Sequence, residues 1–185
     1  MKPIVFITGN QNKADYLAKY LDYPVEHMKL DLDEIQSLDL REVTKHKVRE
    51  AYKKINKPVF VEDVALEFTA LGRLPGTLIK WFVDEMSFED ICSLLDGKDR
   101  SAIARCVFGY HDGETEHYFE GSMKGMIAEK PVGSGGYGWD PIFIPEGFDV
   151  TRAELSEEDN MKTYKKIKPF DEFKEFLKRN SHDNN

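Results

Sequence analysis

The chain has 185 residues, of which 41% are hydrophobic and 32% are charged, and its formal net charge at pH 7 is −8. This length suits one domain, which buries about 70% of its unfolded surface without needing disulfides. No apolar run reaches the ~18 residues of a membrane span, and the acidic balance argues against a general nucleic-acid binder, because such proteins gather Lys and Arg against phosphates.

The first third of the chain predicts alternating strands and helices. Residues 3–8 form a continuous apolar run, typical of a strand covered on both faces, and the polar turn 9–12 leads into a helix that begins near Lys13. Residues 25–32 predict a second strand, followed by an acidic segment. Asp39 and Glu42 have capping-box spacing and precede an apolar helical stripe, so we expect a helix over 40–55.

The rest of the chain predicts a short strand, two short helices and then hairpins. Residues 58–61 read as a buried strand that ends at Glu62 and Asp63, and helices are expected near 79–84 and 88–95. Strands at 101–110 and 116–127 flank a hairpin turn, and an amphipathic helix closes the chain. We expect one domain over 1–185, a mixed twisted α/β sheet with flanking helices and two lobes around a central cleft.

The turn after the first strand has the groups of an anion site. Thr8 offers a hydroxyl, Gly9 frees the backbone amides, Asn10 adds a side-chain amide and Lys13 adds a positive charge at a helix N-terminus. The alternative is an ordinary turn, since Gly and Asn are common turn residues.

Adjacent acids follow the third predicted strand. Glu62 and Asp63 are costly beside a buried apolar run unless a cation such as Mg²⁺ compensates them, and Glu34 in the earlier acidic segment is a third possible ligand. Solvated acids at a strand end are the alternative. The chain has no recognisable Ser or Cys nucleophile motif, so hydrolysis would use a metal-activated water.

The glycine-rich segment 133–138 and the residues after it suit a flat ligand. Tyr137 and Trp139 can stack on a base, and Asp140 can act as a polar selector of a purine. A core tryptophan beside a glycine hairpin is the alternative. A run of lysines between 162 and 168 usually means a solvated face.

Taken in order, these motifs resemble the Ham1 family, also called the inosine triphosphate pyrophosphatase family. The resemblance covers nearly the whole chain and is carried by Thr8-Gly-Asn10-x-x-Lys13, Glu34-Ile-Gln36, Val61-Glu62-Asp63, Leu74-Pro75-Gly76-Thr77, Tyr137-Gly138-Trp139-Asp140-Pro141-Ile142-Phe143 and Ala153-Glu154-Leu155.

The resemblance implies Mg²⁺-dependent hydrolysis of a nucleoside triphosphate to the monophosphate and pyrophosphate. The implied substrates are ITP, dITP and XTP, and the family is usually dimeric. Mg²⁺ would be held by Glu34 and Asp63 with Glu62 beside them, and Asp63 would also be the general base.

The same resemblance places the substrate. It implies that Thr8, Asn10 and Lys13 hold the triphosphate and that Tyr137, Trp139 and Asp140 line the base pocket. The predicted catalytic residues are therefore Lys13, Glu62 and Asp63.

Two parts of the chain depart from the family pattern. Val64 stands where the family usually has a phosphate-binding hydroxyl. Near the C-terminus, the family's lysine aligns with Asn160 and its Ser-His-Arg triplet aligns with Tyr164-Lys165-Lys166. Lysine supplies charge but not the planar fork of Arg, so we expect Lys165 and Lys166 to contact the base with weakened or redirected selectivity, while the cleavage chemistry is kept.

Other readings stay open at this point. One is a non-catalytic nucleotide sensor, and another is the same chemistry on a different modified purine or a pyrimidine triphosphate. The expected partners are a nucleotide and a second copy of the chain, without nucleic acid or membrane. With only two cysteines and no secretory signal, a cytoplasmic location is expected.

Overall fold

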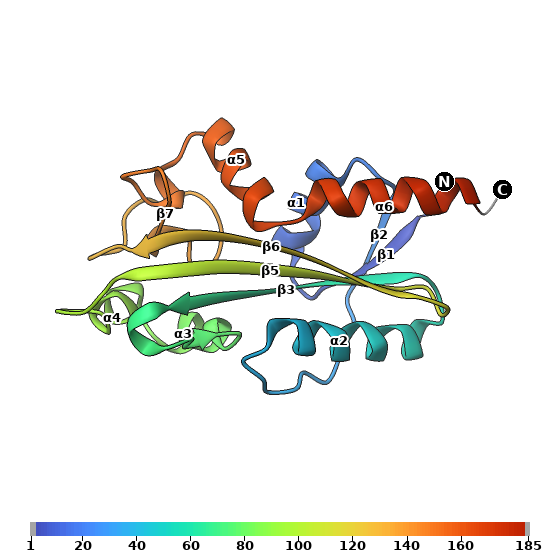
Figure 1. The fold of residues 1–185 in the computed structure, drawn as a ribbon, viewed down its shortest axis with the longest axis horizontal. Helices are drawn as coiled ribbons and strands as arrows, with labels where there is room; N and C mark the ends of the chain where they lie inside the picture. Colours follow the sequence, from blue (N-terminus) through green and yellow to red (C-terminus); the bar gives the residue numbers. More distant parts are fainter. Residues whose placement is uncertain (1–2, 184–185) are drawn as a thin grey trace. The chain divides into compact units, whose positions relative to one another are not determined.

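The computed structural model describes residues 3–183. The strands are β1 (Ile4–Ile7), β2 (Val25–Met28), β3 (Val59–Phe68), β4 (Pro75–Gly76), β5 (Ser101–His111), β6 (Glu116–Ile127) and β7 (Phe143–Pro145). The helices are α1 (Gln11–Leu21), α2 (Leu40–Ile55), α3 (Ile79–Glu85), α4 (Phe88–Ser93), α5 (Glu157–Ile167) and α6 (Phe170–Asp183), with 3₁₀ turns η1 (Thr69–Leu71), η2 (Asp140–Ile142) and η3 (Arg152–Glu154). The strands form a seven-stranded sheet in the order β2-β1-β3-β5-β6-β7, with β4 beside β3 (Figure 1).

The chain divides into two compact units, and three of the four boundaries between them fall inside the strands β3, β5 and β6. The first unit comprises Met1–Asp63, Cys106–Glu120 and Lys168–Asn185, and the second comprises Val64–Arg105 and Gly121–Ile167. Residues 1–2 and 184–185 lie outside the described structure. The single domain over 1–185 and the central cleft stay predictions.

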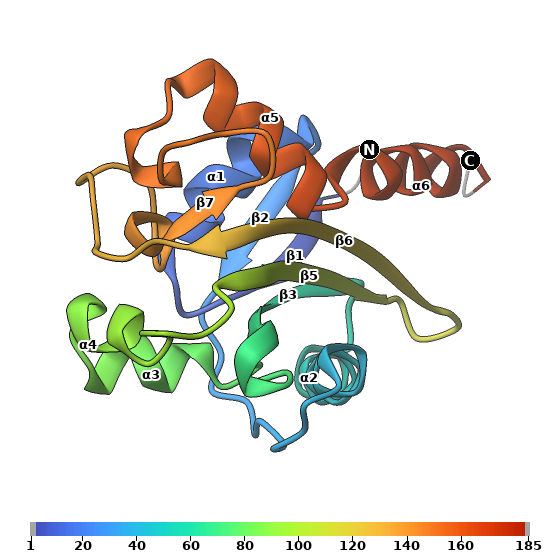
Figure 2. The same ribbon diagram turned by 60° about the vertical axis from the view of Figure 1, so that its left-hand side comes forward.

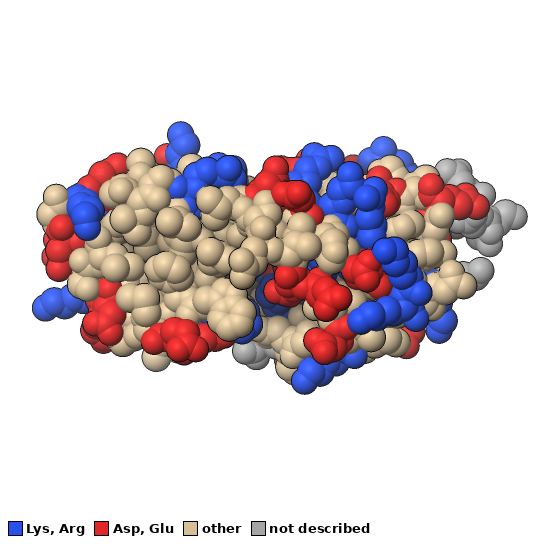
Figure 3. Space-filling model, turned by 90° about the horizontal axis from the view of Figure 1, so that it is seen from below, with Lys and Arg blue, Asp and Glu red and all other residues tan. Residues whose placement is uncertain are grey.

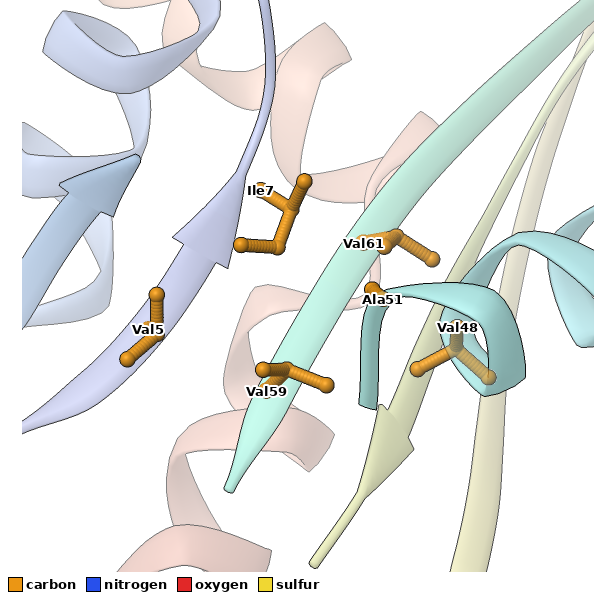
Figure 4. Packing of buried hydrophobic residues seen from close by; sticks show 6 residues of the cluster. All are labelled: Val5, Ile7, Val48, Ala51, Val59 and Val61. Carbon is orange, nitrogen blue, oxygen red and sulfur yellow. The ribbon is translucent and has the colours of Figure 1, made fainter. Parts of the chain in front are cut away.

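The first unit is built on three parallel strands. β1 lies between β2 and β3, with Ile7 opposite both Met28 and Val61. Helix α2 covers one face of these strands, because Val48 and Ala51 on its apolar stripe pack against the β-branched side chains of β1 and β3 (Figure 4). Every residue of this cluster is at most 3% exposed, so α2 is held by continuous apolar burial.

The opposite face of the first unit has an aromatic core. Phe6 and Phe60 stack with ring centroids 4.5 Å apart, and Phe173 of α6 lies 4.9 Å from Phe60. Helices α1 and α6 lie on this side, away from α2 (Figure 1). The amphipathic pattern of α6 therefore reflects a buried face that closes the core over β1 and β3.

The second unit contains the end of β3 (64–68), the start of β5 (101–105) and the end of β6 (121–127). β4 pairs antiparallel with β3, and β7 pairs antiparallel with β6. β7 continues the sheet beyond β6, and helices α3 and α4 lie near β5, away from β7 and α5 (Figure 2). The turns η2 and η3 contact each other, which brings the segment around Asp140 against the segment around Arg152.

The predicted fold class is confirmed as a mixed α/β sheet with flanking helices, and helix 40–55 has the predicted bounds. Two strands were predicted with wrong bounds. β2 ends at Met28 and not at residue 32. β3 does not end at the acid pair but continues to Phe68, because residues 65–68 are buried and Leu66 and Glu67 pair with β4. Helix α5 was not predicted, since most of its residues are polar and the lysine run obscured the three that are buried, Thr163, Tyr164 and Ile167.

Charged side chains of both signs intermix on the face of the molecule that includes α2 (Figure 3). In the first unit, Arg49 pairs with Glu116 and Lys53 pairs with Glu50. The view therefore shows no single-sign basic patch over α2, in line with the acidic composition. Within residues 3–183, no helix is both long enough and apolar enough to cross a membrane.

Candidate active site

The site in the first unit begins where β1 ends and where its parallel pairing with β3 stops. Ile7 pairs with Val61 in the last pair of this register, so Thr8, which follows β1, and Glu62, which lies within β3, come just after the parallel pairing stops. The carboxyl ends of parallel strands are the usual place for a ligand site in α/β sheets.

The turn from β1 into α1 is closed by its own polar side chains. Asn10 caps α1, and its Oδ1 accepts from the amide of Lys13 at 3.3 Å. The hydroxyl of Thr8 accepts from the amide of Asn10 at 3.1 Å, and Gly9 is exposed. The first amides of α1 and the Lys13 ammonium thus lie together at a helix N-terminus, which is the geometry of an anion site.

Glu62 is a buried carboxylate held by two lysines. Its side chain is 1% exposed, and Lys168 Nζ donates to Oε2 at 2.9 Å while Lys13 Nζ lies 3.3 Å from Oε1. Burial acts to raise the pKa of Glu62, but the ammonium groups of Lys168 and Lys13 outweigh it and lower that pKa. Glu62 is therefore an ionised group that fixes the two lysines.

Asp63 has a different set of neighbours, although it is the next residue. Lys47 Nζ, reaching in from α2, lies 2.7 Å from Asp63 Oδ1 and 2.8 Å from Glu34 Oε1. The other oxygen, Asp63 Oδ2, is buried and has no hydrogen-bond partner among the described residues. Burial raises the pKa of Asp63 despite the attraction of Lys47. The pKa values of the two adjacent carboxyl groups are thus shifted in opposite directions, as is found in active sites where two acids have different roles.

Lys47 joins Glu34 and Asp63 through one cation. Burial opposes its charge, but the carboxylates of Asp63 and Glu34 outweigh burial and raise the pKa of Lys47. Because two carboxylates already converge on one ammonium, a cation at this place is electrostatically favoured.

The residues present fit a divalent metal in part. Glu34 is largely exposed and Asp63 has an unpartnered oxygen, and a pair of carboxylates completed by substrate phosphates and water suits Mg²⁺. Among residues 3–183 no group of three acidic, His or Cys side chains is arranged to hold a metal by itself. Since both oxygens of Glu62 face lysines, the geometry favours Glu34 and Asp63 as ligands, and Glu62 as a ligand stays a prediction.

A second polar cluster lies in the second unit, around the predicted base residues. Asp140 is 2% exposed, and its Oδ2 accepts from the amide of Tyr137 at 2.7 Å. Arg152 NH1 lies 3.4 Å from Asp140 Oδ1. Tyr137 and Trp139 are half-buried, so their rings keep surface that a ligand can cover. The carboxylate of Asp140 is turned toward protein groups that shape the loop.

Helix α5 carries the positions at which the sequence departs from the family pattern. Asn160 Oδ1 accepts from Arg152 NH2 at 2.6 Å, and the guanidinium of Arg152 lies 4.1 Å from the ring centroid of buried Tyr164. Lys165 and Lys166 are exposed. Their contact with a base stays a prediction.

Sequence reasoning missed three cations at these clusters: Lys47, Lys168 and Arg152. Lys47 had a signal, because it lies four residues after Val43 and four before Ala51, on the stripe of α2 that faces the sheet. Lys168 was read as part of a solvated lysine run, and only folding shows it buried against Glu62. Nothing local in the sequence marks Arg152.

Together these features define a class of protein. It is a mixed α/β protein in which the turn into α1 has the geometry of an anion site, Glu62 and Asp63 of β3 pair with lysines, and the second unit carries a glycine loop with aromatic residues.

Comparison with known proteins gives the family. Residues 4–176 match the Ham1 family, and the chain belongs to that family. The inosine triphosphate pyrophosphatase 2 of Trypanosoma cruzi is 43% identical over 84% of this chain and 82% of its own, and the inosine triphosphate pyrophosphatase of Scheffersomyces stipitis is 37% identical over 96% and 98%. The crystal structure of a nucleoside-triphosphatase / dITP/XTP pyrophosphatase from Mycobacterium abscessus superposes with a TM-score of 0.73 at 25% identity, over 89% of this chain and 95% of that chain. The predicted family is confirmed.

Proposed function

We propose that this protein hydrolyses nucleoside triphosphates between the α and β phosphates, releasing the monophosphate and pyrophosphate, with ITP, dITP and XTP as substrates. The observation that carries the proposal is the cluster of two acids and their lysines beside the start of α1, in a chain of the Ham1 family. The cluster consists of Glu62, Asp63, Lys13, Lys47 and Lys168. The names of the relatives from Trypanosoma cruzi and Mycobacterium abscessus support both the chemistry and the substrate class.

The phosphates are assigned to the first unit. The amides at the start of α1 and the ammonium of Lys13 attract them, and Glu62 keeps Lys13 in place through its ion pair. Lys47 contributes a further positive charge from α2. These cations stabilise negative charge that grows on the pyrophosphate leaving group, which is the main task of the protein in phosphoryl chemistry.

Asp63 is assigned the role of general base for the attacking water. Its buried Oδ2 has no partner among the described residues, and burial raises the pKa of this carboxyl, so it can accept a proton from the attacking water. When bound by Glu34 and Asp63, Mg²⁺ would neutralise phosphate charge and lower the pKa of a bound water. The substrate phosphates would offer Lys47 a partner in place of the two carboxylates.

The base is assigned to the second unit. Tyr137 and Trp139 present half-buried rings for stacking, and exposed Lys165 and Lys166 supply donors toward oxygen or nitrogen acceptors of a purine. Lysine ammonium groups are point charges without a fixed fork, so we propose that discrimination between bases is weaker than a planar arginine would give.

Product analysis tests the proposal. ITP, dITP, XTP and the four canonical triphosphates are incubated with and without Mg²⁺, and nucleotide products are separated while pyrophosphate is measured. Mg²⁺-dependent, equimolar monophosphate and pyrophosphate from ITP or XTP is the expected result. Diphosphate and orthophosphate would disprove cleavage at this bond, and tight binding of ITP without turnover would favour a nucleotide sensor.

Three further features belong to the proposal. The cofactor is Mg²⁺, the assembly is a homodimer, and the protein acts in the cytoplasm, where its buried free cysteines Cys92 and Cys106 stay reduced. Replacing Mg²⁺ by Ca²⁺ in the product assay tests the metal, and light scattering of the purified protein tests the dimer.

A further inference from the structure

We propose that Arg152 is a positioning residue for base selection: it fixes the base loop, defined as residues 133–140, to helix α5. Its consequence for catalysis rests on the function proposed above. Arg152 is not an expected ligand of the nucleotide, since only 4% of its side chain is exposed. It acts through the groups that it holds.

Arg152 connects three separate segments of the second unit. NH1 lies 3.4 Å from Oδ1 of Asp140, at the end of the base loop, and NH2 donates at 2.6 Å to Oδ1 of Asn160 on α5. The guanidinium lies 4.1 Å from the ring centroid of Tyr164, one turn further along α5. A planar guanidinium satisfies these directions at once, which a lysine ammonium cannot do.

The contact with Asp140 reaches the base residues directly. Asp140 Oδ2 accepts from the amide of Tyr137, so the carboxylate sets the backbone from which the Tyr137 ring projects. Without Arg152, the nearly buried carboxylate loses the guanidinium beside Oδ1, and the weaker compensation of a buried charge favours movement of the loop or protonation of the acid. Either change displaces Tyr137.

The base loop also follows the segment of Arg152 closely. A Cβ on Gly135 would lie 2.7 Å from the carbonyl oxygen of Ala153, and the Gly135 amide donates to that oxygen at 3.2 Å. Gly136 has φ of 76°, and a Cβ there would lie 2.3 Å from Asp140 Oδ2. The loop is therefore shaped around Asp140 and η3, and its conformation depends on both.

The partner on α5 fits this role for Arg152. The amide oxygen of Asn160 accepts from the guanidinium. A lysine at position 160 has no acceptor and would place a second cation beside Arg152. Arg152 and Asn160 thus form a matched pair, in which the positive charge belongs to η3 and the acceptor to α5. The Nε of Arg152 is buried without a hydrogen-bond partner among the described residues. The other two nitrogens, NH1 and NH2, make the contacts with Asp140 and Asn160.

The test separates base binding from phosphate binding. Calorimetry measures the Kd of inosine monophosphate and of tripolyphosphate for wild type, Arg152→Lys and Arg152→Met, and kcat/KM is measured for ITP and ATP. Arg152→Lys keeps the charge in case Arg152→Met fails to fold. Arg100→Lys is the matched control, because Arg100 is also a largely buried arginine of the second unit but bonds to the carbonyls of Cys92 and Ala128.

We expect both Arg152 variants to raise the Kd of inosine monophosphate about tenfold and to reduce the ITP-to-ATP ratio of kcat/KM by a similar factor. The Kd of tripolyphosphate should change less than about twofold. Arg100→Lys should lower Tm without changing the Kd of inosine monophosphate or the ITP-to-ATP ratio of kcat/KM. Equal weakening of both probes, or an unchanged ratio in a folded Arg152→Lys protein, would overturn the inference. If the wild type turns over no triphosphate, the proposed function fails, and the two binding constants still decide the role of Arg152.

Discussion

The two units hold their buried acids in different ways. In the first unit, Glu62 and Asp63 face ammonium groups on long flexible stems, and one oxygen of Asp63 has no partner among the described residues. In the second unit, Asp140 faces a backbone amide and a guanidinium that is itself stacked on Tyr164.

This difference separates a site that can exchange partners from one that cannot. A lysine ammonium is a mobile point charge, and phosphates can replace a carboxylate as its partner without rebuilding the fold. A stacked guanidinium with fixed directions holds one geometry. The first cluster is therefore suited to changing charge during a reaction, and the second to keeping a recognition loop in one shape.

The largest expected effect comes from the acid with the unpartnered oxygen. Asp63→Asn removes the proton acceptor and one metal ligand, and we expect kcat to fall by about 10³-fold. Because burial raises the pKa of Asp63, its ionised form is disfavoured by folding, so Tm should stay equal or rise. Pyrophosphate release and thermal unfolding measure the two effects. A large loss of Tm would mean that Asp63 is as fixed as Asp140.

The neighbouring acid should show the opposite balance. Glu62→Gln leaves Lys168 buried without its carboxylate, and we expect about 3 kcal/mol loss in the free energy of unfolding. The folded pKa of Glu62 is lowered, so its contribution is fully present above the unfolded value of about 4.3 and is lost as pH falls through the folded value. Urea unfolding of both proteins should therefore show their difference shrinking below about pH 4. A difference independent of pH would contradict the ion-pair explanation.

The mobility of the first cluster can be tested through its metal affinity. Lys47→Met removes the ammonium that occupies Glu34 and Asp63, so we expect Mn²⁺, used as a probe for Mg²⁺, to bind the nucleotide-free protein about tenfold more tightly. Turnover should fall, since a phosphate partner is lost as well. Calorimetry without nucleotide measures the affinity, and unchanged Mn²⁺ binding would show that Lys47 does not compete with the metal.

A surface pair gives the smallest expected effect and a baseline for both clusters. Arg41 NH1 lies 3.0 Å from Glu120 Oε1, but the two side chains are 59% and 51% exposed. Glu120→Gln should change the free energy of unfolding by less than about 0.5 kcal/mol and leave kcat unchanged, because water and salt screen exposed pairs. A larger change would indicate that ion pairs at the surface of this chain matter as much as the buried ones.

Much of the fold could be predicted because it depends on local patterns. The apolar run before Thr8 gives β1, and the cap at Asp39 with the stripe through Val48 and Ala51 gives α2. The acid pair and the turn at Lys13 were also visible, since charged groups next to buried strands are unusual in themselves. The family followed from the order of these motifs.

What only the tertiary structure decided is which cation meets which acid. Lys168 is 106 residues from Glu62 along the chain, and Lys47 is 16 residues from Asp63, yet the fold brings each ammonium within 3 Å of its carboxylate. Arg152 has no local signature at all, and its role depends on η3 packing against η2 and α5. Local periodicity specifies which face of an element is buried, but side-chain pairing across elements depends on how those faces are packed together, and a single sequence does not encode that locally.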